Sequence, residues 1–126
     1  MTFYVCSVCN QVHIKIIDQK KPLICCDNET VELIPNTIEA EVIQHKPIIR
    51  KIGNFVTLDV PKEHPMVDIH HILFMGIETN EGIQIKYLKK EEPARVGFVL
   101  SKDEYVLSVF VFCSVHWLFS LDYNKQ

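Results

Sequence analysis

The sequence lacks long runs of one charge or of apolar residues, and these absences exclude several classes of protein. Its 126 residues carry a net charge of -3, and no basic run is longer than Lys20-Lys21 or Lys89-Lys90, so a nucleic-acid-binding surface is not expected. No segment reaches the roughly 18 apolar residues of a membrane span, and Met1 is not followed by the basic and apolar regions of a leader. We therefore expect a soluble, cytoplasmic protein without a membrane or nucleic-acid partner.

The sequence also lacks a helical period, internal repeats and low-complexity tracts. From Thr37 onward its apolar runs are short and rich in Val, Ile, Phe and Tyr, and they alternate with polar residues over 55–60 and 83–87. Turn residues separate the runs at intervals that suit antiparallel strands. The pattern predicts an all-β fold with a seven-stranded immunoglobulin-like β-sandwich. The expected strands are 47–51, 54–60, 69–77, 82–88, 95–100, 105–112 and 117–121.

The first part of the chain differs from the rest. A chain of 126 residues, 48% of them apolar, can bury one modest core, and any additional module needs another source of stability. Short apolar pieces and paired cysteines fill the N-terminal region until Pro35-Asn36 interrupts the pattern. We therefore expect a small metal-bound module over residues 1–36 and a β domain over residues 37–126.

The five cysteines fit metal binding better than disulfides. Their number is odd, and the expected compartment is reducing. Cys25 and Cys26 are neighbours, so a disulfide between them would be strained, whereas two adjacent thiolates can both reach one metal ion. Metal ligation is therefore the better interpretation.

Four of the cysteines form two close pairs, Cys6-Ser-Val-Cys9 and Cys25-Cys26, with fifteen residues between them. A Cys-x-x-Cys turn points two thiolates at one centre, and a second pair completes a tetrahedral four-sulfur shell that suits iron or zinc. The competing interpretation, small buried cysteines without a ligand, has to account for two tight pairs within the first 26 residues. We predict a four-cysteine site and leave iron and zinc open.

A second group of candidate ligands lies beyond residue 44. It combines four histidines with one cysteine: His45, His64, His70, Cys113 and His116. Cys113 and His116 are three residues apart at the end of an apolar strand, so a turn there can aim both side chains at one metal ion. In an extended segment His70 and its neighbour His71 point to opposite faces, so only one of the two can reach a given centre.

Each of these histidines has a simpler interpretation as a loop, turn or core residue when it is taken alone. As a set, four imidazoles and one thiolate make a five-coordinate shell with one open position, where chemistry can occur. The set therefore predicts a second metal site, and His13 is expected to be a surface residue of the small module.

Together these motifs resemble the desulfoferrodoxin type of superoxide reductase over nearly the whole chain. The paired cysteines are similar to the family's N-terminal desulforedoxin-like module, which holds iron in four cysteines. His64-Pro65-Met66, with His70 beyond it, resembles the family's His-Pro-Met segment and its following ligand. Cys113-x-x-His116 resembles the closing Cys-x-x-His motif, and His45 with Pro47 resembles the family's loop His-x-Pro.

The resemblance implies an immunoglobulin-like β domain, a homodimer and a second iron centre. His45, His64, His70 and His116 would be the equatorial ligands of that iron, with Cys113 as the axial thiolate and His71 left out. The implied activity is one-electron reduction of superoxide to hydrogen peroxide at ferrous iron. An external donor such as rubredoxin would return the electron.

Two positions depart from the family's pattern. Ile43 and Gln44 stand where the family has a glutamate and a lysine, so the usual cation above the open site is missing. Lys46, which follows the loop histidine, is our candidate to replace it, with Lys51 and Lys62 of nearby loops as alternatives, because a positive charge near the site steers an anion. Trp117 stands where the family has a glycine after the last histidine, which predicts a reshaped turn.

Two other functions are compatible with the sequence. The missing loop charge favours a non-catalytic iron protein for electron transfer or storage, in which the reductase site is silenced. Alternatively, a plain β-sandwich interaction domain with a zinc-stapled tail would make the histidines incidental. Iron content, visible colour and consumption of superoxide distinguish the three functions.

Overall fold

The computed structural model describes residues 1–36, 46–60 and 64–123, and the chain divides into two compact units, Met1–Ile34 and Pro35–Gln126. The described residues form strands, turns and loops without a helix, which confirms the expected all-β fold. In this part of the chain there is consequently no helix long and apolar enough to cross a membrane.

The first unit is built from five short strands. The strands β1 (Phe3–Val5), β2 (Val12–Ile14) and β5 (Val31–Leu33) make an antiparallel sheet with β1 in the middle, and β3 (Ile24–Cys25) pairs with β4 (Asn28–Glu29). Among its described residues, Phe3 and Cys6 are the fully buried apolar side chains. Two such side chains are too few for a core, so another interaction has to stabilise this unit.

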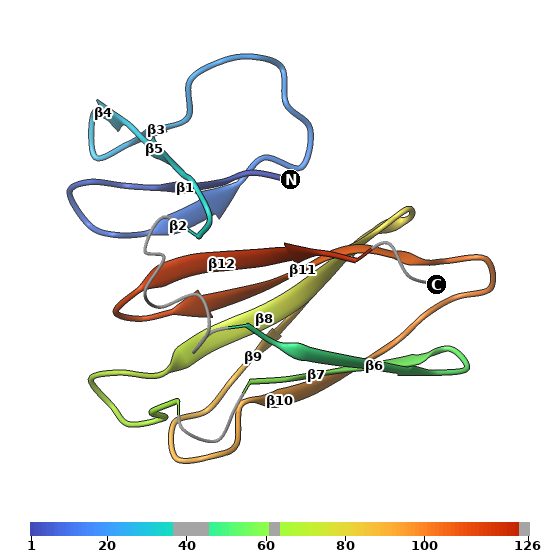
Figure 1. Ribbon diagram of the computed structural model, residues 1–126. Coiled ribbons are helices and arrows are strands. Elements are labelled where there is room, and N and C mark those ends of the chain that lie inside the picture. The colour runs from blue at the N-terminus through green and yellow to red at the C-terminus, as the bar shows by residue number, and fades with distance from the viewer. Residues whose placement is uncertain (37–45, 61–63, 124–126) are drawn as a thin grey trace. The chain divides into compact units, whose positions relative to one another are not determined.

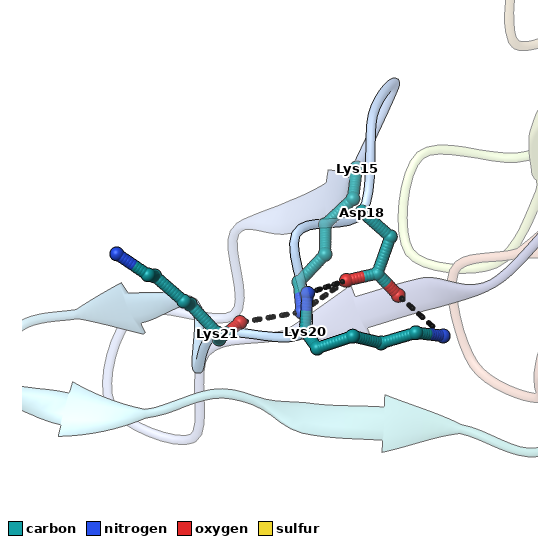
Figure 2. Close-up of polar contacts among 4 residues, drawn as sticks. All are labelled: Lys15, Asp18, Lys20 and Lys21. Atoms are coloured by element: carbon teal, nitrogen blue, oxygen red, sulfur yellow. Dashed lines mark hydrogen bonds and ion pairs between the residues drawn. The ribbon is translucent and has the colours of Figure 1, made fainter.

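The connection between β2 and β3 is organised by polar contacts around Asp18 (Figure 2). The Lys15 ammonium donates to the Lys21 carbonyl at 2.7 Å and lies 3.5 Å from an Asp18 oxygen, which also accepts the Lys20 backbone N–H at 2.8 Å. That N–H and the two nearby ammonium groups lower the pKa of Asp18. The Asp18 carboxylate therefore offsets part of the positive charge in this loop.

The second unit contains two antiparallel sheets (Figure 1). One has the order β10 (Arg95–Val99), β7 (Phe55–Asp59), β6 (Ile48–Ile52). The other has the order β12 (Trp117–Asp122), β11 (Val106–Cys113), β8 (Ile72–Thr79), β9 (Gly82–Tyr87). Within the described ranges these are seven strands in two layers, as expected for an immunoglobulin-like sandwich.

The core lies between the two sheets, and alternate residues of the central strands fill it. Successive side chains of a strand point to opposite faces, so every second residue is buried. The members from the first sheet are Val56, Leu58, Val96 and Phe98, and those from the second include Met75, Ile77, Val109 and Val111. The apolar alternation of the sequence thus corresponds to the inner face of the sandwich.

Aromatic side chains occupy the opposite face of β8 and β11. The rings of Phe74 and Phe112 stack with centroids 5.0 Å apart and planes within 7°. Phe110 meets Phe74 edge to face and covers Gly76, where an added Cβ would overlap the Phe110 ring. Gly76 therefore provides the space that this ring needs.

Strand β8 begins at Ile72, three residues later than the predicted start at residue 69. The segment before it forms a turn, in which Val67 and His70 exchange backbone hydrogen bonds of 3.0 and 3.1 Å. The predicted start was wrong because the alternation of apolar residues does not distinguish a strand from a short turn next to it. This turn positions His70.

Candidate metal centres

The first cluster brings together the side chains of Cys6, Cys9, Cys25 and Cys26, whose sulfur atoms all lie within 4.8 Å of one another. The Cys25 sulfur is 3.8 Å from that of Cys9 and 4.0 Å from that of Cys26, and none of the cysteines forms a disulfide. Sulfurs bound tetrahedrally at about 2.3 Å from one metal ion are about 3.8 Å apart. The cluster therefore fits a single iron or zinc ion.

Two tight backbone turns aim these four sulfurs. Asn10 N–H donates to the Cys6 carbonyl at 2.9 Å, and Cys9 N–H points at the Cys6 sulfur at 3.5 Å. The other pair lies on the β3–β4 hairpin, where Cys26 and Asp27 have φ values of 52° and 61°. Two left-handed residues in the middle of a two-residue loop are typical of a type I′ turn. This turn allows the adjacent thiols to face the same point.

The pKa values of three thiols in this cluster are shifted in opposite directions. The backbone N–H of Cys9 lowers the pKa of Cys6 to about 6, because it donates to the sulfur and stabilises the thiolate. The neighbouring Cys6 side chain raises the pKa of Cys25 to about 12, and the pKa of Cys26 is raised as well, with Cys9 as the largest cause. Without a cation the cluster resists holding four negative charges, so the donor set suits a metal ion.

The second cluster unites His64, His70, Cys113 and His116, whose ligand atoms also lie within 4.8 Å of one another. The Cys113 sulfur is 3.5 Å from His64 Nε2 and 3.7 Å from His116 Nδ1. Ligands bound at about 2.1 and 2.3 Å from one metal ion are about 3.1 Å apart when they are perpendicular and about 3.6 Å apart at the tetrahedral angle. Three imidazoles and one thiol thus have the spacing of one metal shell.

The rings of this second cluster are arranged edge to face. His70 lies between the other two histidines, with centroid distances of 5.0 Å to His64 and 4.9 Å to His116. The interplanar angles of 75° and 69° prevent the rings from stacking. In each of these pairs one ring therefore points its edge toward the face of the other.

The tautomer of His64 follows from its neighbour. Its Nδ1 lies 2.7 Å from the Pro65 carbonyl oxygen, which can only accept, so Nδ1–H is the donor. The lone pair is consequently on Nε2, the atom that faces Cys113. A carbonyl that fixes the ring in this way is a common support for a metal-bound histidine.

Irregular backbone at the end of β11 directs Cys113 and His116. A register shift between Phe112 and Cys113 places an extra residue on β8, so that Cys113 pairs with Ile72. Bulges of this kind re-aim side chains next to functional sites. The hairpin then closes with Trp117 opposite Cys113 and at a φ of 68°, the left-handed conformation that glycine adopts without strain. Trp117 thus keeps a glycine-like turn.

Two predicted site residues are not part of the described clusters. His45 lies outside the described residues, as do Ile43 and Gln44, so its role as a fourth imidazole stays a prediction. Lys46 is exposed and borders a cavity of about 150 Å³ together with Phe119. Its role as a steering charge also stays a prediction.

The remaining histidines lie apart from the clusters. His71 Nδ1 is 3.1 Å from the Val67 carbonyl, so it turns away from the centre that His70 faces. His13 pairs with Tyr4 across β1 and β2, and its Nε2 is buried without a hydrogen-bond partner. His13 is half-buried, and its expected role as a surface residue of the small module stays a prediction.

Two further side chains, which were not among the predicted ligands, hold the segments next to the second cluster. Met66 packs against the core and its sulfur accepts the Ile72 N–H at 3.4 Å. Ser114 contacts the backbone of His71. The motif around His64 included Met66, but the spacing of the ligands indicated neither its contact with Ile72 nor the contact of Ser114 with His71.

The fold and the two clusters define a metalloprotein with a cysteine-bound module and a β-sandwich centre. Residues 37–122 match the family model described as desulfoferrodoxin, and the chain belongs to this family. It is 25% identical over 119 residues to the desulfoferrodoxin homolog of Archaeoglobus fulgidus, covering 94% of each chain. It is 24% identical over 115 residues to the desulfoferrodoxin of Desulfarculus baarsii, covering 90% of this chain and 91% of the relative.

Solved structures share the fold. The superoxide reductase from Treponema pallidum aligns with a TM-score of 0.77 and 24% identity, covering 96% of both chains. A superoxide reductase from Giardia intestinalis, labelled 1Fe-SOR, aligns with a TM-score of 0.54 and 16% identity over 65% of this chain and 98% of its own. At these identities the likeness concerns the fold.

Proposed function

We propose that this chain is a superoxide reductase, which converts superoxide into hydrogen peroxide with one electron and two protons. The observation that carries the proposal is the second cluster, in which three imidazoles surround a fully buried cysteine. Membership of the desulfoferrodoxin family supports it. An iron ion bound there by His64, His70, Cys113 and His116, with His45 as a fifth ligand, would supply the electron.

The residues of the cluster prepare it for an anionic substrate. Cys113 is 0% exposed, so its sulfur is kept from water and its negative charge requires a positive partner. The imidazoles are neutral ligands, and the Pro65 carbonyl holds His64 in the tautomer that presents a lone pair. Cys113 therefore contributes the single negative charge of this donor set, which leaves the site attractive to superoxide.

The two units have separate roles in this proposal. Residues 1–36 form a desulforedoxin-like module that holds iron or zinc, and residues 37–126 form the domain that reacts with superoxide. Each turnover consumes an electron, so an external donor such as rubredoxin has to return it. We also propose a cytoplasmic homodimer, as family likeness implies.

Metal analysis and a visible spectrum of the ferricyanide-oxidised protein test the proposal, followed by addition of superoxide to the reduced form. We expect iron in the histidine and cysteine cluster, and oxidation of that cluster by superoxide without release of dioxygen. If iron is bound but superoxide is not consumed, the non-catalytic electron-transfer alternative is favoured. If metal is confined to the four-cysteine cluster, both readings fail.

Two matched cysteine variants assign the signals. Cys113→Ser is expected to remove the thiolate-to-iron absorption band of the second cluster and the reaction with superoxide, because serine is a poor substitute for a soft thiolate. Cys9→Ser removes one thiolate from the first cluster and should leave that reaction in place. A Cys113→Ser protein that still reacts at the original rate would sink the assignment.

A further inference from the structure

The segments that carry the ligands of the second cluster meet at Ser114. Its backbone N–H donates to the His71 carbonyl at 2.9 Å, and its hydroxyl oxygen accepts the His71 backbone N–H at 3.0 Å. The two residues therefore exchange a pair of hydrogen bonds. One member of that pair depends on a side chain, so a substitution can remove it while the backbone bond stays.

This pair lies next to ligands on both sides. Ser114 follows Cys113 and precedes His116 by two residues, and His71 follows His70. The regular β8–β11 ladder ends at Cys113 and Ile72, directly after a register shift. Beyond that point Ser114 and His71 continue the connection between the two segments by one step.

The side-chain bond has a specific geometric reason. In a regular antiparallel pair the His71 N–H would donate to a backbone carbonyl of the facing residue. Ser114 is already part of the turn that leads to His116, and its hydroxyl accepts this N–H instead. Alanine at this position would leave the part-buried N–H without that acceptor.

We infer that Ser114 is a positioning residue of the metal centre: its hydroxyl ties the His70–His71 segment to the Cys113–His116 turn and thereby fixes His70 relative to the Cys113 sulfur. This role rests on one part of the proposed function, namely that the second cluster binds iron. The partners that orient metal ligands commonly contribute a factor of roughly 10 to 100 in metal affinity. Ser114 acts through the backbone of His71 and does not bind the metal.

Ser114→Ala and Ser114→Thr test this role in the full-length, iron-loaded protein. The alanine variant is expected to shift the thiolate-to-ferric absorption band of the second cluster, and to lower iron affinity there by roughly 10- to 100-fold in competition with a coloured ferrous chelator. The threonine variant keeps the hydroxyl and should restore both properties. The metal ion of the four-cysteine cluster, iron or zinc, serves as an internal reference, since its release should not change.

Ser108→Ala is the matched control. Ser108 lies on strand β11, and its hydroxyl contacts Glu78 at 3.5 Å and not the cluster. The absorption band and the iron affinity of the Ser108→Ala variant should therefore equal those of the unmodified chain. A Ser114→Ala protein that unfolds more easily but keeps the original band and iron affinity would overturn the inference alone. A missing band in the unmodified chain would overturn the inference and the proposed function together.

Discussion

Replacing Trp117 by alanine and by glycine separates two contributions to stability in the turn after His116: the strain of a left-handed backbone and the contact of the indole ring with Phe112. The backbone of Trp117 has a φ of 68°, and the left-handed region costs a residue other than glycine roughly 1 to 2 kcal/mol. The Trp117 ring meets Phe112 edge to face at 5.8 Å, and such aromatic pairs contribute about 1 kcal/mol. The indole is 37% exposed, so the energy from its burial is modest.

At most positions a glycine variant is less stable than an alanine variant, and at position 117 we expect the reverse. Alanine loses the ring contact and keeps the strain, so we expect a loss of about 1 kcal/mol in the free energy of unfolding. Glycine also loses the contact but relieves the strain, which brings its stability close to that of the unmodified chain. The glycine variant should therefore be more stable than the alanine variant by about 1 kcal/mol.

Urea unfolding followed by circular dichroism measures this difference at equal metal loading. Trp117 is the single tryptophan, so its fluorescence cannot serve all variants. Val115 in the same turn is the matched control, because it is exposed and has no positive φ. There glycine should be less stable than alanine by up to about 1 kcal/mol. If alanine is the more stable residue at position 117 as well, the left-handed turn is refuted.

Three further changes have defined outcomes. Removal of metal by a chelator should unfold Met1–Ile34 and leave the sandwich folded, as hydrogen exchange can measure, because the first unit buries few apolar side chains. Glu104→Gln should cost about 1 kcal/mol at pH 7, since the Thr79 hydroxyl and a backbone N–H donate to the carboxylate and lower its pKa. Lys90→Ala should slow the reaction with superoxide about twofold at low salt. The variant leaves Asp68, which lies two residues before His70, without its ion-pair partner at 2.8 Å, and the unbalanced carboxylate repels an anion.

Each of these outcomes has its own check. Protection of residues 1–34 after complete metal removal would contradict the first. The Glu104 contribution is fully present above the ordinary value of 4.5 and is lost as pH falls through the lowered folded-state pKa, so a gap to Gln that persists in acid refutes the second. The Lys90 effect should vanish at high ionic strength, and Lys102→Ala at another exposed lysine should have a smaller effect.

Alternation of apolar residues was sufficient to predict the seven strands of the sandwich, because each strand buries one face. The start of β8 could not be predicted, since Val67 and His70 pair across a turn that has no glycine or asparagine to mark it. The β3–β4 hairpin was missed for a similar reason. Its left-handed residues are Cys26 and Asp27, and a cysteine gives little sign of a turn.

The ligands of the clusters were predicted from residue type and spacing, as cysteine and histidine pairs have few other uses at such distances. The contacts that hold these ligands in place were not predicted. The Ser114 hydroxyl acts through a tertiary contact with His71, which only the fold brings near. The Pro65 carbonyl and the Met66 sulfur act on His64 and Ile72, and these local contacts depend on the backbone conformation of the segment. A pattern along the chain contains no information about such contacts.

The ring of Phe110 above Gly76 has a consequence for how this sequence can change over evolutionary time. A side chain at position 76 would overlap both the ring and the backbone carbonyl oxygen of Gln84, which lies 2.6 Å from the added Cβ, so a smaller residue at position 110 would relieve only one of the two overlaps. Position 76 is therefore expected to stay glycine among relatives, whatever residue stands at position 110. The Gln84 oxygen belongs to the backbone of the paired strand β9, so a change of side chain elsewhere does not make room for a Cβ at this position, and the sheet would be overpacked.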